Sequence, residues 1–385
     1  MTERIYLDHA ATTPIRAEVR EAMMPFLSTE AFGNPSSLHV DGQRAKRALD
    51  SARATLAQAL GVQFSEVTFM SGGTEADNAA LVGVMLANRG RDNRVVTATN
   101  EHEAVLHSCR FLESLGIEVV YVAPDEDGFV SPDRIADAVD ERTVLVSVMH
   151  ANNEVGTIQP VREIAEIAHA AGAWLHTDAV QTFGLLPVNA VDLGADLISV
   201  SSHKIYGPKG VGALYVREGI PIEPLLHGGA QERERRAGTE NVAGIAGFAK
   251  AVDLSTAERA QICARLIPLR DRLIDRLLAI DGAVLNGHRA LRLPGNVNIS
   301  FPWLHAEELL LALDLAGVSA SSGSACTSGS IEPSHVLLAM GLGDDRARSA
   351  LRFTLGRETT VDEIDRAAAI VERIVEGQRR SSILI

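Results

Sequence analysis

Short apolar runs alternate with amphipathic helical patterns from about residue 45 to residue 250. The runs EVTFM, RVVTA, TVLVSVM, AWLHT and DLISV are apolar almost throughout, which is typical of strands buried on both faces of a sheet. Segments such as VREIAEIAHAAG lie between several of these runs and repeat apolar residues at helical spacing. This order predicts an α/β fold in which helices flank a mostly parallel central sheet.

A second, smaller α/β unit is expected after this sheet. Residues 256–281 have the pattern of a long amphipathic helix, and the strand-like runs NVNISFP and ALRFTLG and a final helical pattern follow it. We therefore expect a large domain over residues 14–257 and a small C-terminal domain over residues 258–385. Residues 1–13 are expected to pack near the small domain.

Composition narrows the classes of function. A formal net charge of −14 argues against nucleic acid or an anionic membrane as the main partner. The apolar runs are shorter than the roughly 18 residues of a membrane span, and the amino terminus has no apolar signal segment. Three cysteines without a CxxC pair argue against a zinc site or a disulfide framework. We expect a soluble, cytoplasmic enzyme that needs neither nucleic acid nor a membrane as partner.

A lysine follows one of the predicted strands. Lys204 comes just after the apolar run LISV and is preceded by Ser201, Ser202 and His203. Ligands of open α/β sheets bind at the carboxyl ends of strands, and a lysine amine can form a Schiff base with an aldehyde cofactor such as pyridoxal 5'-phosphate (PLP). By its position alone, Lys204 is more often a loop lysine with its amine in water.

Other strand ends carry residues that suit the same cofactor. Asp178 can keep a pyridine nitrogen protonated or can cap a helix. His102 can lie over a ring and move protons, or can be a surface residue of a first helical turn. Asn153 and Gln181 can bind ring oxygens or can belong to ordinary turns. Each residue is a weak signal, but together and in this order they favour a PLP site.

The segment SGGTEADN joins a strand to a helix. Backbone N–H groups around Gly73 can hold a phosphate at the helix N-terminus, and Thr74 adds a hydroxyl. The alternative is an ordinary helix start, with Thr74 as N-cap and Asp77 at the third helical position. Neither a GxxxxGK[ST] nor a GxGxxG motif occurs, so a nucleotide site is not indicated.

Cys326 lies in SSGSACTSGS, where no neighbour can bury its thiol. Cysteine is usually a buried residue, so this position indicates a reactive thiolate. We expect the surrounding loop to be mobile. Cys109 and Cys263 lie on apolar helical faces and are expected in the core.

Nine motifs in order resemble the cysteine desulfurases: YLDHAATTP, GNPSSLH, SGGTEADN, EHEAVL, NNEVG, HTDAVQ, SSHKIYGPKG, RAGTEN and SSGSACTSGS. This resemblance covers nearly the whole chain and implies a homodimeric PLP enzyme of fold type I in the class V aminotransferase-like group. The cysteine loop is most similar to the nitrogen-fixation (NifS) type and next to the housekeeping (IscS) type. The tail GQRRSSILI differs from that of the housekeeping type, which leaves the scaffold partner open.

The resemblance also implies roles for single residues. Lys204, His102 and Cys326 are the implied catalytic residues, and Cys326 is also a possible transient iron–sulfur ligand during sulfur transfer. Arg352 would bind the substrate carboxylate with Asn34 as a further contact, whereas a surface arginine on a strand is the alternative. The implied cofactor-binding residues, with Thr239 reaching the partner subunit's cofactor, are Gly73, Thr74, His102, Asn153, Asp178, Gln181, Ser201, His203, Lys204 and Thr239.

The implied function is PLP-dependent conversion of L-cysteine to L-alanine. The sulfur would stay on Cys326 as a persulfide and then pass to an iron–sulfur scaffold protein, in nitrogenase-type cluster assembly. Two other functions stay open: a PLP-dependent aminotransferase or selenocysteine/cysteine lyase, and a non-catalytic sulfur-relay protein. Cys326 distinguishes the desulfurase from the first, and a bound cofactor distinguishes it from the second.

Overall fold

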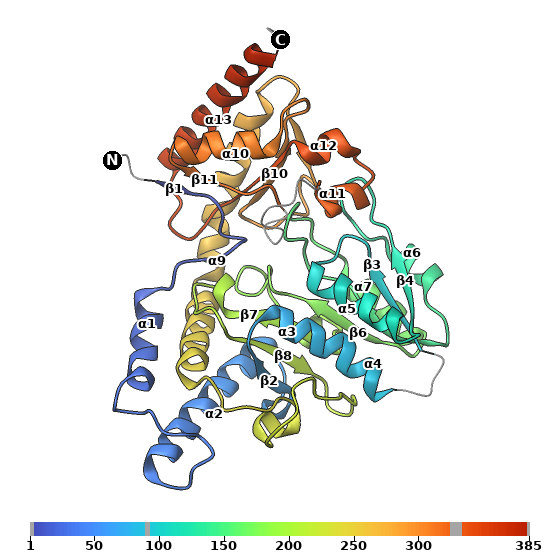
Figure 1. Ribbon diagram of the computed structural model, residues 1–385, viewed down its shortest axis with the longest axis vertical. Helices are drawn as coiled ribbons and strands as arrows, with labels where there is room; N and C mark the ends of the chain where they lie inside the picture. Colours follow the sequence, from blue (N-terminus) through green and yellow to red (C-terminus); the bar gives the residue numbers. More distant parts are fainter. Residues whose placement is uncertain (1–3, 89–92, 324–332, 383–385) are drawn as a thin grey trace.

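A seven-stranded sheet forms the centre of the larger part of the computed structural model, which describes residues 4–88, 93–323 and 333–382 (Figure 1). Its strand order is β2-β8-β7-β6-β5-β3-β4. The strands are β2 (Val67–Met70), β3 (Arg94–Ala98), β4 (Glu118–Val122), β5 (Thr143–Ser147), β6 (Trp174–Asp178), β7 (Leu197–Ser201) and β8 (Gly212–Val216). All pairs from β7 to β4 are parallel, and only β8 pairs antiparallel, with β2 and β7. The predicted α/β fold with a mostly parallel sheet is confirmed.

Helices cover both faces of this sheet (Figure 1). They include α2 (Val40–Leu60), α3 (Gly73–Asn78), the π-helical η3 (Ala79–Gly83), α4 (Val84–Ala87), α5 (Glu103–Ser114), α6 (Pro132–Ala138), α7 (Val161–Ala170) and α8 (Ala190–Leu193). In β7, Leu197 packs into a core with α3, α4 and α5, whereas the next residue, Ile198, packs into a core with α2. Both faces of the strand are therefore buried, which explains its continuous apolar sequence.

The smaller part contains a three-stranded antiparallel sheet of order β12-β10-β9 and a parallel pair of β1 with β11. Its elements are β1 (Ile5–Tyr6), β9 (Val284–Asn286), β10 (Asn296–Ser300), α10 (Ala306–Leu315), β11 (Val318–Ser319), α11 (His335–Ala339), α12 (Asp344–Arg348), β12 (Ala350–Thr354) and α13 (Val361–Ser382). The pairing of β1 with β11 brings the amino-terminal segment onto this part of the chain.

One helix, α9 (Val242–Leu278), runs from the larger part into the smaller one (Figure 1). Phe248 packs in the core of the larger part, and Leu273 packs in that of the smaller part. The helix begins earlier than the expected start at residue 256, because the small and apolar residues that precede that position also pack against the sheet. The expected domain boundary at 257/258 falls inside this helix, and the division into two domains stays a prediction.

The described cysteines differ in burial. Cys109 is fully buried in α5, as expected, whereas Cys263 of α9 is only half-buried and donates its thiol to the Leu185 carbonyl at 2.9 Å. Cys326 and its loop lie outside the described residues. Within those described residues, no helix is apolar over a length sufficient to cross a membrane.

The remaining short elements are α1 (Ala17–Met23) and the 3₁₀ turns η1 (Met24–Leu27), η2 (Phe64–Glu66), η4 (Ser202–Lys204) and η5 (Gln231–Glu234). In η5, Glu232 has a φ of 46°, in the left-handed region that non-glycine residues rarely adopt. A buried ion pair holds it there: both Glu232 carboxylate oxygens lie 2.7 Å from guanidinium nitrogens of Arg53. The Phe69 N–H also donates to Glu232, at 2.8 Å. This ion pair fixes the turn against β2.

Replacing Glu232 with Gln should lower the free energy of unfolding by about 3–5 kcal/mol, because Arg53 would stay buried without its counter-ion. Urea titration followed by circular dichroism measures the difference. The matched control is Asp50→Asn, which removes the exposed partner of Lys46 in α2 and should change stability by less than about 0.5 kcal/mol. Equal effects of the two variants would contradict the role given to the buried pair.

Candidate active site

A cavity of about 320 Å³ opens where β5, β6 and β7 end. Both its position and its lining agree with the rule that ligands bind at the carboxyl ends of parallel strands. The lining residues are Ala10, Ala11, Gly73, Thr74, Asp77, His102, Met149, Ala151, Asn153, Asp178, Val180, Gln181, Ser201, His203, Lys204, Gly323 and Arg352. The structure therefore brings together all but one of the residues expected to bind the cofactor, the exception being Thr239, and adds Arg352.

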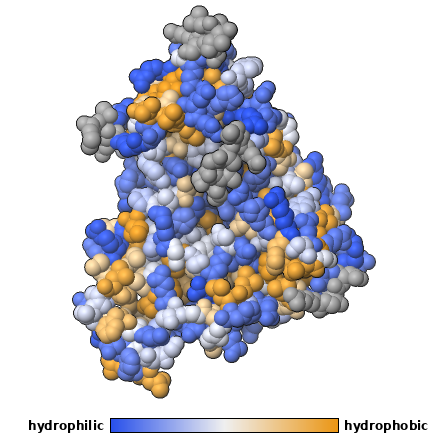
Figure 2. All heavy atoms as spheres, viewed as in Figure 1, coloured by the Kyte–Doolittle hydropathy of each residue, from blue (hydrophilic) through white to orange (hydrophobic). Residues whose placement is uncertain are grey.

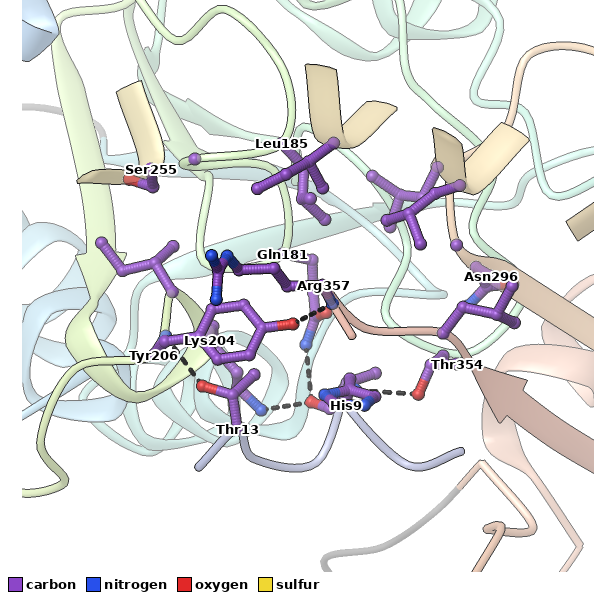
Figure 3. A pocket seen from close by; sticks show the side chains of 18 of the residues that line it. His9, Thr13, Gln181, Leu185, Lys204, Tyr206, Ser255, Asn296, Thr354 and Arg357 are labelled. Atoms are coloured by element: carbon purple, nitrogen blue, oxygen red, sulfur yellow. Dashed lines mark hydrogen bonds between the residues drawn. The ribbon is translucent and has the colours of Figure 1, made fainter. Parts of the chain in front are cut away.

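Lys204 lies at the edge of this cavity, in the turn that follows β7. Its Nζ donates to the carbonyl oxygens of Ala10 and Ala11, the latter at 2.9 Å. The Gln181 amide also donates to the Ala10 carbonyl, at 3.1 Å, and the Ala10 N–H donates to the Thr354 hydroxyl at 2.8 Å. Figure 3 shows Lys204 and Gln181 reaching the amino-terminal segment from one side and Thr354 from the other. The amino terminus thus forms one wall of the site.

Further contacts hold this segment beside the lysine. His203 Nδ1 lies 3.1 Å from the Thr12 hydroxyl, and the Thr13 hydroxyl donates to the His203 carbonyl at 2.9 Å. The Tyr206 N–H donates to the Thr13 hydroxyl at 2.8 Å. Burial lowers the pKa of His203 to about 4, with a smaller effect from the Lys204 charge, so its imidazole is neutral near pH 7.

Two carboxylates and an imidazole face the cavity together. Ligand atoms of Asp77, His102 and Asp178 all lie within 4.8 Å of one another. Burial raises the pKa of Asp178, while the nearby His102 opposes this shift. Burial, and then the Asp178 charge, raise the pKa of Asp77 well above its usual range. Because two neighbouring buried carboxylates repel each other, a proton or a cationic ring near them is stabilised.

Both Asp178 and His102 accept a backbone N–H as well as lining the cavity, but only His102 caps a helix, so the helix N-cap considered for Asp178 is not found. Asp178 accepts the Val180 N–H at 2.8 Å, which fixes the turn after β6. His102 is the N-cap of α5, where its Nδ1 accepts the Ala104 N–H at 3.1 Å. At His102, helix capping and a position in the cavity therefore coexist. Burial lowers the pKa of His102, which favours the neutral imidazole.

A second group of cavity residues, around Gly73 and Ser201, suits an anion. The helix begins at Gly73 with Gly72 as its N-cap, two residues earlier than expected, so Thr74 is not the N-cap, and no side chain caps the first turn. A Cβ on Gly73 would lie 2.7 Å from Val180, so only glycine allows this close approach. The buried Ser201 hydroxyl has no hydrogen-bond partner among the described residues. Uncapped backbone N–H groups beside such a hydroxyl can bind a phosphate.

Arg352, on β12 of the smaller part of the chain, also lines the cavity. It is 2% exposed, which excludes the surface-arginine alternative. Its Nη1 donates to the carbonyls of Asn153, at 3.1 Å, and Gly323, at 3.3 Å, and its Nη2 lies 3.0 Å from the Asp8 carboxylate. The ordinary turn considered as the alternative for Asn153 is formed by its neighbour Asn152, whose Oδ1 accepts the Glu154 N–H. The Asn153 Oδ1 has no hydrogen-bond partner within the described part of the chain and can accept one from a ligand.

Three expected site residues are not found in this cavity. Asn34 is exposed, and its Oδ1 accepts the Ser36 N–H at 2.9 Å in a local turn. Thr239 is exposed in a separate pocket that also contains Glu232. Its expected role was in the partner subunit, which one chain does not test. Cys326 lies outside the described residues.

Residues 5–367 match the aminotransferase class-V family. A cysteine desulfurase IscS of Methanosarcina thermophila is 50% identical over 380 residues, which cover 99% of this chain and 94% of the relative. The cysteine desulfurase IscS of Dictyoglomus turgidum is 50% identical over 383 residues, covering 99% and 97% of the two chains. The chain is a cysteine desulfurase of the class V aminotransferase family. Both of these relatives carry the name IscS, so the nitrogen-fixation subtype stays a prediction.

Solved structures agree with this membership. A NifS-like protein superimposes on the desulfurase with a TM-score of 0.91 and is 38% identical, with 97% of this chain and 99% of that chain covered. The protein SspA in complex with cysteine has a TM-score of 0.80 and 33% identity, with 92% and 100% covered. The fold is therefore that of the PLP fold-type I desulfurases.

Sequence reasoning missed two polar residues of the desulfurase site. Asp77 was considered only as part of a helix start, yet it is 1% exposed and faces the cavity. Its spacing of four from Gly73, which places both on one helical face, could have revealed it. His176 lies deeper, between the hydroxyls of Ser147 and Ser199 at 2.9 and 3.0 Å, and 3.7 Å from Asp77. Its position inside β6 gave no signal, because the layer forms only when three strands pair.

Burial lowers the pKa of His176 to about 3, so the folded desulfurase holds a neutral imidazole there. An unfolded histidine takes up a proton near its ordinary pKa of about 6.5. The stability that comes from this difference is complete above about pH 6.5 and is lost as the pH falls toward the folded-state value. His176→Gln, which cannot take up this proton, should therefore lose less melting temperature than the parent between about pH 7 and about pH 5.

Differential scanning calorimetry at several pH values measures this slope. The matched control is His227→Gln, which changes an exposed histidine and should follow the parent curve. If the His176→Gln curve runs parallel to the parent curve, the buried neutral imidazole is not a source of acid sensitivity.

Proposed function

We propose that this desulfurase converts L-cysteine to L-alanine with PLP and retains the sulfur as a persulfide on Cys326. One observation carries the proposal: a single cavity unites the amine of Lys204, the carboxylate of Asp178, the imidazole of His102 and the guanidinium of Arg352. These groups suit an amino acid substrate bound to an aldehyde cofactor. The names of the relatives and the solved relative in complex with cysteine support this substrate.

The donor set of the cavity fits PLP. Uncapped backbone N–H groups at Gly73 and the unpartnered Ser201 hydroxyl would hold the phosphate. Asp178 would face the ring nitrogen, and the unpartnered Oδ1 of Asn153 would accept a hydrogen bond from the ring hydroxyl. Buried polar groups without partners destabilise a fold, so their concentration here favours a polar ligand. When bound, PLP supplies an electron sink that makes the Cα proton of an amino acid acidic.

The chain's own residues then direct the chemistry. Lys204 would hold the cofactor through its amine, and the same amine would serve as the base for the substrate Cα proton. Asp178, as a carboxylate, would favour a protonated ring nitrogen. His102 is neutral, because burial lowers its pKa, and can therefore both accept and donate a proton. Arg352 orients the substrate by binding its carboxylate.

Sulfur transfer needs a thiolate. Cys326 would attack the sulfur of L-cysteine, so that a new S–S bond forms as the substrate Cβ–S bond breaks. The substrate carbon skeleton leaves as L-alanine, and the enzyme keeps the sulfur as a persulfide. The exchange is balanced without any external oxidant or reductant.

We propose further that the enzyme works as a cytoplasmic homodimer that delivers sulfur to an iron–sulfur scaffold protein. Large apolar side chains are exposed between residues 24 and 40, among them Phe32 at 67% and Leu38 at 93%, and Figure 2 shows apolar surface over that end of the molecule. A second copy that covers this region would also explain why Thr239 lies outside its own cavity. Delivery to nitrogenase-type assembly, and transient cluster binding by Cys326, rest on the loop motif alone.

Replacing Cys326 with Ala should abolish the formation of L-alanine from free L-cysteine, because the sulfur would lose its acceptor. Cofactor absorbance should stay at the parent level. Alanine release and persulfide labelling measure the outcome, and Cys109→Ala, in a buried position away from the site, is the matched control that should keep activity. Full alanine production by Cys326→Ala would instead support a lyase that frees sulfide.

Lys204→Ala tests the cofactor separately. The purified parent should be yellow, with an absorbance band that the variant loses, because the covalent anchor is gone. Lys209→Ala, a lysine in the turn just beyond, should keep the band. A colourless parent would contradict PLP chemistry and favour the sulfur-relay alternative.

A further inference from the structure

The Nε/Nη2 side of the Arg352 guanidinium is only partly used by hydrogen bonds within the fold. Side-on binding of a carboxylate uses the parallel N–H groups of Nε and Nη2. The Nη1 end is committed to two backbone carbonyls, those of Asn153 and Gly323. Within the described residues, Nε has no hydrogen-bond partner although it is buried. A carboxylate that enters the cavity therefore has the Nε/Nη2 side of Arg352 as its binding edge.

That edge is already half occupied by a carboxylate of the chain. Asp8 Oδ1 lies 3.0 Å from Nη2 of Arg352. The Arg352 side chain is 2% exposed, so its charge needs a counter-ion when no substrate is present. We propose that the Asp8 carboxylate occupies the binding position of the substrate carboxylate on Arg352. It neutralises Arg352 in the resting enzyme and moves away from Nη2 when L-cysteine binds. The proposal rests on the substrate role of Arg352 given above.

The backbone around Asp8 allows such an exchange without unfolding. The Thr354 N–H donates to the Leu7 carbonyl at 2.7 Å, and the His9 N–H donates to the Thr354 carbonyl at 3.3 Å. These bonds fix the segment to β12, the strand that carries Arg352. The Asp8 side chain itself is 19% exposed and can rotate toward water, whereas the guanidinium stays in place. Only one side-chain rotation is therefore required.

The exchange also acts on the product. L-Alanine has the same α-carboxylate as L-cysteine, so Asp8 competes with both ligands for Arg352. Its return to Nη2 assists product release, while its competition weakens substrate binding. Asp8 is thus a positioning residue with opposite effects on binding and on release, which a merely structural residue would not have.

Propionate, which has a carboxylate but neither an amine nor a thiol, isolates this step. We expect Asp8→Asn in the PLP-loaded, full-length enzyme to bind propionate about tenfold more tightly than the parent, because the competing charge is gone. Propionamide of the same size should bind neither protein measurably. Asp314→Asn, which removes the exposed partner of the amino-terminal Arg4, is the matched control and should bind like the parent. Calorimetric titration at matched ionic strength measures the affinities.

Equal or weaker propionate binding by Asp8→Asn would overturn the proposal. Because the measurement involves no sulfur chemistry, it can succeed or fail independently of the proposed desulfuration. Steady-state kinetics gives a second readout: the variant should show a lower KM for L-cysteine and stronger inhibition by L-alanine. A higher KM with unchanged alanine inhibition would also count against it.

If Asp8→Asn does not fold, the parent enzyme itself provides the test. A crystal of the parent enzyme grown with propionate should show the ligand on the Nε/Nη2 edge of Arg352 and the Asp8 carboxylate turned away. An Asp8 carboxylate that stays on Nη2 beside bound propionate would refute the exchange.

Discussion

Parallel pairing of β5, β6 and β7 is the constraint on which the site depends. It places the chain that leaves each strand at the same edge of the sheet, so that Asn153, Asp178 and Lys204 meet although 51 residues separate the first from the last by sequence number. Helices on both faces exclude water from the strands, and the cavity opens at this edge. The cavity follows from the topology of the sheet.

Burial then determines the state of the groups in that cavity. Removal from water penalises charge, so it raises the pKa of Asp77 and Asp178 and lowers that of His102 and His203. The site consequently combines carboxyl groups whose pKa is raised with imidazoles whose pKa is lowered. Its remaining positive charges, on Lys204 and Arg352, lie where a cofactor aldehyde and a substrate carboxylate are expected. Desolvation therefore prepares the site for proton transfer.

The sequence predicted those elements and residues that are marked by a pattern of consecutive residues. A continuous apolar run marks a buried strand, and the polar residues at its end can be read directly from the sequence. Lys204, Asp178 and His102 were identified from this signal. Helix α9 was predicted too short because residues from Val242 onward are small and apolar on several faces, so no amphipathic stripe marks them. Asp77 was missed because its helix start had an ordinary explanation.

The chain by itself determined the α/β order of elements, the polar residues at the strand ends and the motifs that indicated a cysteine desulfurase, since all of these are written in consecutive residues. Only the tertiary structure decided which distant groups meet. The pairing of Asp8 with Arg352 joins residues 344 positions apart, and the layer of His176 with two serines joins three strands. No local pattern records such contacts, because they arise from the packing of separate elements and from the cost of leaving a buried charge unpaired.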